Sequence, residues 1–263
     1  MTHSFDALRG EYISLLASMQ VTRAQETNAT AARLLRYQTR YLDVATATGV
    51  PVLLLAALHN RESDANFNTY LGNGEPLNRV TRLVPKGRGP FPSWEAGAKD
   101  GLHVDRLDQV SDWSWPKALY YGELWNGFGP RDYHGINTGY LWAGTNHYTR
   151  GKYVADGRWD GAHVDTQLGI VPVMKRMATL DPSLDLPPDS KVPAPPSAPD
   201  LSVAQIQHAL NAAGDGPLDE DGSLGMKTRA AIKAFQSAHG LIPDGIVGPH
   251  TTQALVDATA KKG

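Results

Sequence analysis

The chain has 263 residues, of which 41% are apolar and 20% charged, and this composition is typical of a globular protein of one or two domains. The formal net charge of −2 supplies no positive field, and the longest apolar run, residues 50–58, is too short to cross a bilayer. We therefore expect neither nucleic-acid binding nor membrane insertion. The absence of cysteine excludes disulfides, zinc-thiolate sites and a cysteine nucleophile.

Residues 4–48 predict two helices with few reactive side chains. Thr22 and Gln25 have the spacing of a capping box, in which each side chain satisfies a backbone N–H of the first helical turn. The apolar stripe predicted to bury these helices consists of Leu34, Leu35, Tyr37, Tyr41 and Leu42.

A core helix is predicted from about Pro51 to Ser63, because proline favours the first helical position and the residues that follow are apolar on nearly every side. Glu62 lies at its C-terminal end, where burial and the negative end of the helix dipole both raise a carboxyl pKa. Glu62 is therefore predicted to be a proton donor near neutral pH. The alternative is a structural ion pair with Arg61 or another basic residue.

A turn and a strand-like segment follow this helix. Asn73 and Gly74 indicate a turn, Glu75 is expected to be extended because it precedes proline, and residues 79–84 look strand-like. Glu75 is thus a second acid soon after the helix that ends near Glu62.

Aromatic residues are concentrated between residues 113 and 159, where twelve of 47 residues carry an aromatic ring. Rings with polar tips suit a groove in which a glycan is stacked and hydrogen bonded. A helix predicted over residues 118–127 contains Glu123. This residue is a rival to Glu75 as a catalytic carboxylate or, as the alternative, a residue that orients its neighbours or carries an ion pair. The predicted substrate-binding residues are Tyr70, Asn73, Tyr121, Trp125, Asn126, Tyr140 and Trp142.

Seven prolines lie between residues 181 and 200, which predicts a semi-rigid spacer because proline interrupts helices and sheets. The predicted organisation is a catalytic domain over residues 1–180, a proline-rich linker over residues 181–200 and a small domain over residues 201–263.

The small domain contains an internal repeat. The pattern Asp-Gly-x-x-Gly-x-x-Thr starts at Asp221 and recurs at Asp244, and each copy predicts a glycine turn followed by the start of a helix. An earlier helix begins with a capping box of Ser202 and Gln205, and Phe235 is expected to pack against its apolar stripe. The prediction is a three-helix bundle.

The repeat, together with residues 230–236 and 240–245, closely resembles the three-helix peptidoglycan-binding domain of cell-wall hydrolases. The resemblance covers roughly residues 201–258 and implies that bacterial peptidoglycan is a partner. No Trp or Tyr is present there to stack on a sugar, so loops and backbone are expected to contact the peptide stem or polar groups.

Five segments of the larger region resemble the lysozyme-like domain of a phage-type endolysin group, over about residues 50–170. They are Arg61-Glu62-Ser63, Gly74 to Leu77, Tyr121 to Gly127, Tyr140-Leu141-Trp142 and Gly151 to Gly157. The resemblance implies a mainly α fold: an α+β lysozyme-like catalytic domain with a small β-region, beside the three-helix bundle.

Phage lysozymes of this superfamily use a glutamate, then an acid, then a threonine six positions after that acid. Glycoside hydrolysis needs a general acid at the glycosidic oxygen and a second carboxylate across the sugar ring. Glu75 and Thr81 have this second spacing, so the resemblance implies that Glu75 is the second carboxylate and that Thr81 helps to hold the attacking water. The interval of 13 residues from Glu62 to Glu75 is longer than the usual one, and Glu replaces the commoner Asp.

These features predict a lysozyme-type glycoside hydrolase that cleaves the β-1,4 bond between N-acetylmuramic acid and N-acetylglucosamine and so lyses the host cell. One alternative is a lytic transglycosylase that leaves 1,6-anhydro ends. Less favoured are a zinc peptidase or amidase and a non-catalytic wall-binding protein. Since no histidine pattern has the spacing of metal ligands, neither a metal nor another cofactor is expected.

The location of the protein is predicted from its first residues. Met1 to Asp6 contain neither the basic nor the apolar segment of a Sec-type signal. We therefore expect a protein that is made in the host cytoplasm and reaches the peptidoglycan of the periplasm after holin-type release. The protein is also expected to be a monomer.

Overall fold

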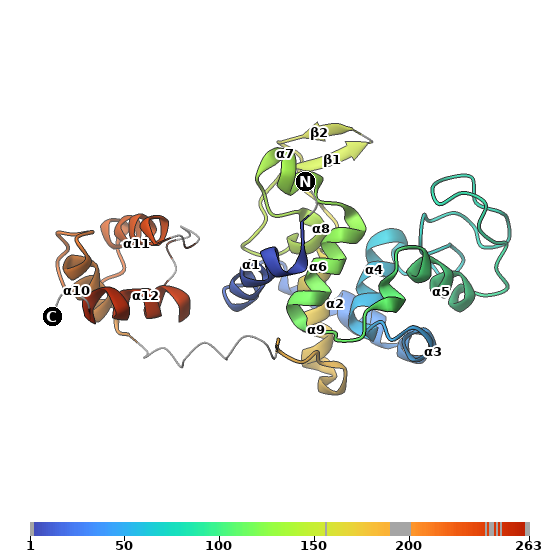
Figure 1. Ribbon diagram of the computed structural model, residues 1–263, viewed down its shortest axis with the longest axis horizontal. Helices are drawn as coiled ribbons and strands as arrows, with labels where there is room; N and C mark the ends of the chain where they lie inside the picture. Colours follow the sequence, from blue (N-terminus) through green and yellow to red (C-terminus); the bar gives the residue numbers. More distant parts are fainter. Residues whose placement is uncertain are drawn as a thin grey trace. The chain divides into compact units, whose positions relative to one another are not determined.

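The computed structural model describes residues 3–155, 157–189, 201–239, 241, 245, 247 and 249–260. These residues are mainly helical and contain one two-stranded sheet, which confirms the predicted mainly α fold with a small β-region. The chain divides into two compact units, and the division falls after Asp189 (Figure 1).

The described part of the first unit holds nine α-helices, two 3₁₀ helices and two strands. The α-helices are α1 (Phe5–Ala17), α2 (Ala24–Leu35), α3 (Gln38–Thr48), α4 (Val52–Ser63), α5 (Trp94–Val104), α6 (Trp115–Asn126), α7 (Gly129–His134), α8 (Gly139–Trp142) and α9 (Ile170–Leu180). The 3₁₀ helices are η1 (Leu107–Gln109) and η2 (Pro182–Leu184), and the strands are β1 (Lys152–Ala155) and β2 (Arg158–Asp160).

Helix α4 forms the centre of the first unit. Residues 52–59 are all buried, and the helix packs against α3, α6 and α9. Pro51 is its N-cap, so the helix begins at Val52, one position after the predicted start, and Asp64 ends it in the left-handed region with φ 52°. Among the described residues no single helix is long and apolar enough to cross a membrane; α3 and α4 pass that test together, bent by 115°.

Residues 4–48 form three helices, whereas two were predicted. Arg36 and Tyr37 separate α2 from α3. The predicted capping box is also wrong, because Arg23 is the N-cap of α2 and makes no side-chain cap. The carbonyl of Gly144 accepts the backbone N–H groups of Thr22 (2.8 Å) and Arg23 (3.3 Å), so a tertiary contact holds the residues at the start of this helix.

The small β-region lies elsewhere than predicted. Residues 79–84 contain no strand and belong to the long loop between α4 and α5. The two strands are instead β1 and β2, which pair antiparallel with Tyr153 opposite Trp159. The loop is held by its own hydrogen bonds: the backbone N–H of Thr81 donates to Arg88 O at 2.9 Å, and that of Gly87 donates to Thr81 O at 3.0 Å.

Residues 181–189 pack within the first unit, although the sequence pattern assigned them to the linker. Leu186 is buried, the indole Nε1 of Trp115 donates to Asp185 Oδ1 at 2.9 Å, and the backbone N–H of Trp115 donates to Pro187 O at 3.2 Å. The rest of the predicted linker, residues 190–200, lies outside the described residues.

The second unit is a bundle of α10 (Val203–Ala213), α11 (Met226–Ala238) and α12 (Pro249–Ala260). Ser202 and Gln205 form the predicted capping box at the start of α10. Phe235 and Leu255 are fully buried in the core with Leu210, so the three helices share one apolar centre. The predicted three-helix architecture is confirmed.

The internal repeat has a structural basis in two buried glutamines. Gln207 Oε1 accepts the backbone N–H of Gly222 at 2.9 Å, and Gln236 Oε1 accepts that of Gly245 at 2.8 Å. Both glycines have positive φ, 74° and 79°, which a side chain would strain. The amide nitrogen of Gln236 donates to Thr251 at 3.2 Å. The glycine turns are therefore tied to the helices by equivalent hydrogen bonds in the two repeats.

Candidate active site

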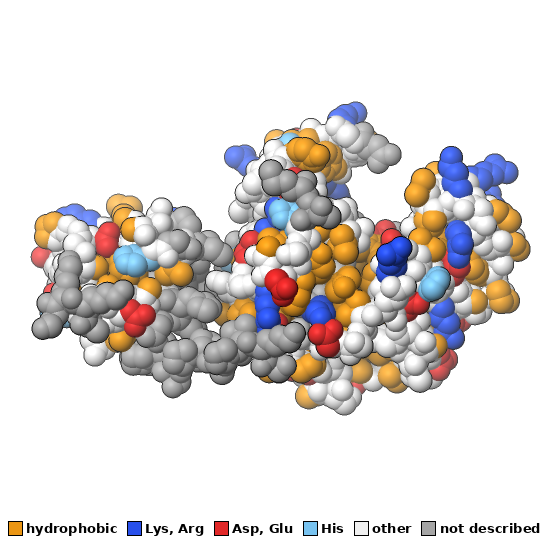
Figure 2. All heavy atoms as spheres, viewed as in Figure 1, with side chains coloured by type: hydrophobic (Ala, Val, Ile, Leu, Met, Phe, Trp, Pro, Cys, Tyr) orange, Lys and Arg blue, Asp and Glu red, His pale blue; other side chains and the backbone are white. Residues whose placement is uncertain are grey.

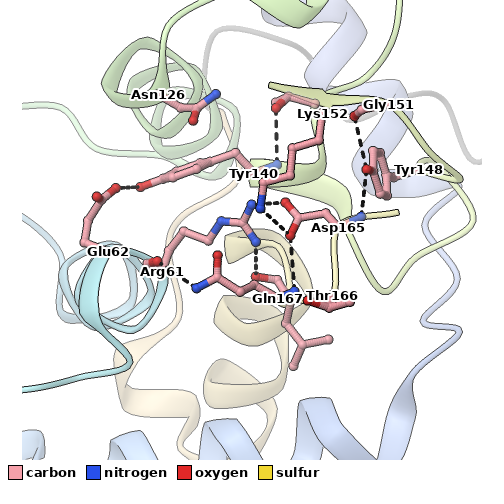
Figure 3. A network of polar contacts seen from close by, with 12 residues as sticks. Arg61, Glu62, Asn126, Tyr140, Tyr148, Gly151, Lys152, Asp165, Thr166 and Gln167 are labelled. Carbon is pink, nitrogen blue, oxygen red and sulfur yellow. Dashed lines mark hydrogen bonds and ion pairs between the residues drawn. The ribbon is translucent and has the colours of Figure 1, made fainter. Parts of the chain in front are cut away.

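Three helices of the first unit converge on the carboxyl group of Glu62. Glu62 lies on the last turn of α4 and its side chain is exposed, whereas the preceding Arg61 is buried. Glu62 Oε1 accepts a hydrogen bond from Tyr140 Oη of α8 at 2.6 Å (Figure 3) and one from Trp125 Nε1 of α6 at 3.1 Å. Two aromatic residues far apart in the sequence therefore orient one carboxyl group.

The pKa of Glu62 is raised above its usual value. Desolvation by the surrounding protein is the main cause, while the hydrogen bonds from Tyr140 and Trp125 act in the opposite direction because they stabilise the anion. The carboxyl group is reached by solvent but is largely surrounded by protein atoms. It is thus an accessible acid, and the direction of the shift agrees with the sequence-based expectation.

Arg61 does not pair with Glu62, because a different carboxylate holds it. Its guanidinium forms a buried ion pair with Asp165, whose other oxygen accepts a hydrogen bond from Lys152 Nζ at 2.9 Å (Figure 3). Burial alone would raise the pKa of Asp165, but hydrogen bonds and charges from Arg61 and Lys152 hold it below its usual value. The Arg61 guanidinium also lies 5.1 Å from the centroid of the Tyr140 ring.

A cavity of about 460 Å³ opens beside this network. Its walls come from the end of α6, the start of α7, α8 and β1, and include Asn126, Tyr140 and Lys152. In Figure 3, Glu62 and Lys152 lie at opposite ends of Tyr140. In Figure 2 the surface is hollowed between the part that carries β1 and β2 and the part that carries the α4–α5 loop.

Glu75 and Thr81 lie together in the α4–α5 loop. Glu75 Oε2 accepts the backbone N–H groups of Arg82 at 2.7 Å and Leu83 at 2.8 Å. These bonds, that of Leu83 above all, lower the pKa of Glu75. The Thr81 hydroxyl donates to Pro85 O at 2.7 Å and accepts the N–H of Arg88 at 3.0 Å, so it already bonds the loop backbone twice.

Glu123 is buried on the side of α6 that faces α1 and α7. Its carboxylate accepts two hydrogen bonds from Arg131, at 3.0 and 2.9 Å, and one from Tyr12 Oη at 2.7 Å. Arg131 also bonds Glu11, so the cation is shared by two acids. Two roles were predicted for Glu123, and in the structure this residue forms the ion pair.

Two predicted substrate-binding rings are fully buried. Tyr70 stacks on Phe91 with 5.1 Å between ring centroids and donates to Asp100 at 2.8 Å. Trp142 is enclosed in the core and meets His147 edge-on at 5.1 Å. Neither side chain can contact a glycan in this conformation, because both are fully shielded from solvent.

The remaining predicted residues fall into three places. Tyr121 is half-buried and packs edge-on against Trp113, with 5.3 Å between the ring centroids. Asn73 lies in the loop with Glu75, where its amide donates to Leu83 O at 3.3 Å. Asn126 is exposed and lines the cavity.

The structure thus brings together Glu62, Trp125, Asn126 and Tyr140. The sequence pattern did not predict Lys152 or Asp165, because nothing local to either residue indicates a partner on α4. Within the described ranges, no group of three or more His, Asp or Glu side chains is arranged to hold a metal ion.

Comparisons with known proteins bear on the second unit. Residues 200–255 match the peptidoglycan binding domain family. The chain is 52% identical over 48 residues to an "Uncharacterized protein in bpoA1 3′region" of Kitasatospora aureofaciens; the match covers 18% of this chain and 39% of that protein. No solved structure matches the chain. The protein therefore carries a peptidoglycan-binding domain over residues 200–255, which relates it to the bacterial cell wall.

Proposed function

We propose that the protein is a peptidoglycan hydrolase that cleaves the β-1,4 bond between N-acetylmuramic acid and N-acetylglucosamine, with Glu62 as the general acid. The observation that carries the proposal is the environment of Glu62: an accessible carboxyl with a raised pKa, oriented by Tyr140 and Trp125. A raised pKa favours the protonated carboxyl, which donates its proton to the glycosidic oxygen as the bond breaks.

Glu75 is the proposed general base. Its pKa is shifted in the direction opposite to that of Glu62, and a base must be ionised when the acid is protonated. The single hydroxyl hydrogen of Thr81 is donated to Pro85 O, so a water bound there would have to donate to Thr81 Oγ1. Thr81 would then orient the water while Glu75 removes its proton.

A lytic transglycosylase is the second candidate. This reaction uses the same acid but needs no activated water, since the sugar's own hydroxyl attacks and leaves a 1,6-anhydro end. The engagement of Glu75 Oε2 and the Thr81 hydroxyl with the loop backbone favours it. In both reactions Glu62 remains the proton donor.

The phage-type resemblance supports an endolysin that lyses its host after holin-type release to the periplasm. The peptidoglycan-binding domain would hold the first unit close to its substrate and raise its effective concentration there. Co-expression with and without a holin tests this route: lysis without the holin would contradict it.

The proposed activity is tested by digesting purified sacculi and analysing the products by mass spectrometry. The unmodified protein should release muropeptides with reducing N-acetylmuramic acid ends. Glu62→Gln should release at least 100-fold less, since general acid catalysis contributes about 10²–10⁴-fold. The matched control is Glu26→Gln, at an exposed glutamate paired with Arg23 on α2, and it should leave the rate unchanged.

The products separate the candidates. Products with 1,6-anhydro ends would show that the reaction is transglycosylation and not hydrolysis, whereas shortened peptide stems would indicate a peptidase. Undiminished release by Glu62→Gln would remove Glu62 from the mechanism. Binding of sacculi without any cleavage would leave only the wall-binding function.

A further inference from the structure

The described residues that line the cavity beside Tyr140 carry an excess of positive charge. Among them, Arg61, Lys152 and Asp165 are the acidic and basic side chains, so two cations share one anion. Asp165 has its pKa held below the usual value and is ionised near neutral pH. One positive charge is therefore uncompensated among the described side chains that line the cavity.

Lys152 is the cation that a ligand can reach. Its side chain is 33% exposed, whereas those of Arg61 and Asp165 are 5% and 1% exposed. An ammonium group has three N–H donors, and the bond to Asp165 Oδ1 at 2.9 Å uses one of them. Lys152 can thus bind a second acceptor while Asp165 keeps it in place.

The backbone around Lys152 offers further polar groups. The cavity is lined by all four residues of β1, and within the described part of the sheet β1 pairs only with β2. Because an antiparallel partner takes about half of a strand's N–H and C=O groups, the others are available to amide groups of a ligand.

The cavity lies next to the proposed acid. Arg61 and Glu62 are neighbours on α4, but Arg61 lies beneath the Tyr140 ring and Glu62 accepts a hydrogen bond from the hydroxyl at its end (Figure 3). A sugar whose glycosidic oxygen meets Glu62 would therefore direct a substituent past Tyr140 toward Lys152.

We propose that this cavity binds the carboxylate carried by the lactyl-peptide substituent of a muramyl residue, with Lys152 as the residue that selects it. The proposal rests on the hydrolase function and names the part of the substrate that the site distinguishes. A carboxylate accepts both remaining N–H donors of Lys152 and compensates the excess charge. N-acetylglucosamine has no such group, so the cavity discriminates muramyl glycans from chitin-type glycans.

The test measures binding by calorimetry with the full chain carrying Glu62→Gln, so that the probes stay intact. The probes are a disaccharide bearing a stem peptide, the same disaccharide with a free lactyl carboxylate, and chitotetraose, which has no carboxylate. Lys152→Met, Lys152→Arg and the control Lys99→Met are introduced into this background. Lys99 lies on α5 and does not line the cavity. The peptidoglycan-binding domain is identical in every variant, so its contribution cancels.

Lys152→Met should weaken binding of a carboxylate-bearing probe about tenfold, as expected for loss of one charge-assisted contact. Lys152→Arg should restore most of this affinity, and Lys99→Met should have no effect. The Lys152→Met variant should remain folded, because Asp165 keeps its bonds to Arg61 and to the backbone N–H of Gln167.

The probes also identify which carboxylate is bound. Weakening confined to the peptide-bearing probe assigns a carboxylate of the stem peptide. Weakening confined to the free-lactyl probe assigns the lactyl carboxylate, which is an amide in the peptide-bearing probe, and weakening of both muramyl probes shows that Lys152 accepts either carboxylate. The proposal would be overturned if Lys152→Met left the affinity for both muramyl probes unchanged, or if it weakened the binding of chitotetraose by the same factor. Because the readout needs no cleavage, an inactive unmodified protein would refute the hydrolase function while this test still reported on the cavity.

Discussion

Tyr140 Oη donates a 2.6 Å hydrogen bond to Glu62 Oε1, which joins α8 to the end of α4 across 78 residues of sequence. The pKa of Tyr140 is raised well above its usual value, first by burial and then by the charge of Glu62. The phenol therefore remains a donor throughout the neutral range. Since this bond stabilises the Glu62 carboxylate, it limits how far desolvation raises the pKa of the acid.

Tyr140→Phe should move the alkaline limb of the pH–activity profile to higher pH. Removal of the hydroxyl removes a bond that favours the Glu62 anion, so the pKa of Glu62 rises and the acid stays protonated longer as the pH increases. A shift of about one pH unit is expected, which corresponds to about 1.4 kcal/mol. The measurement is the rate of sacculus digestion between pH 5 and 9.

Trp125→Phe is the matched comparison, because it removes the longer bond at 3.1 Å. The alkaline limb of the Trp125→Phe pH–activity profile should also move to higher pH, but by less than that of Tyr140→Phe. An alkaline limb that stays in place in both variants would show that the titrating group is not Glu62.

Glu123→Gln should destabilise the first unit by about 3 kcal/mol, as expected when one partner of a buried ion pair is removed. Arg131 would lose its charged partner on α6 and retain only Glu11. Urea denaturation, monitored by tryptophan fluorescence, measures the change in the free energy of unfolding, with Glu26→Gln at an exposed position as the control. The folded fraction should keep its activity. A stable but inactive Glu123→Gln protein would instead support a catalytic role for this carboxylate.

His59 should make the protein less stable as the pH falls. It is buried between Tyr41, Phe67 and Trp94, and desolvation lowers its pKa from 6.5 to about 4. Between these values the unfolded chain binds a proton that the folded protein does not, so stability is complete above pH 6.5 and is lost toward pH 4. The expected loss is about 3 kcal/mol.

The measurement is urea denaturation at pH 7.0 and 4.5, for the unmodified protein and for His59→Phe. The variant is expected to show a smaller difference between the two pH values, whatever its absolute stability. An equal pH dependence in both proteins would assign the effect to other groups.

A chain that ends after Leu180 should be less stable than one that ends after Asp189. The shorter chain loses the burial of Leu186 and the bond from Trp115 to Asp185, which together contribute about 2–3 kcal/mol. Thermal unfolding of both chains measures the difference. Trp115→Phe in the longer chain isolates the hydrogen bond, and equal melting temperatures of the two chains would contradict the packing of residues 181–189.

The sequence by itself determined the features that depend on short stretches of chain. The Ser202–Gln205 capping box and the three-helix unit are predicted correctly, because a cap and an apolar stripe are complete within one or two helical turns. The apolar run of α4 likewise sufficed to place Glu62 at the end of a buried helix and to predict a raised pKa.

Only the tertiary structure decided which groups those side chains meet. The carbonyl of Gly144 overrides the local cap at Thr22, and residues 79–84 bond within their loop instead of forming a strand. The local pattern allowed Arg61 to pair with Glu62, yet Asp165, 104 residues away, holds Arg61 and leaves Glu62 to Tyr140 and Trp125. Local propensity acts over a few residues, whereas a buried charge takes its partner from whichever segment the folded core brings beside it.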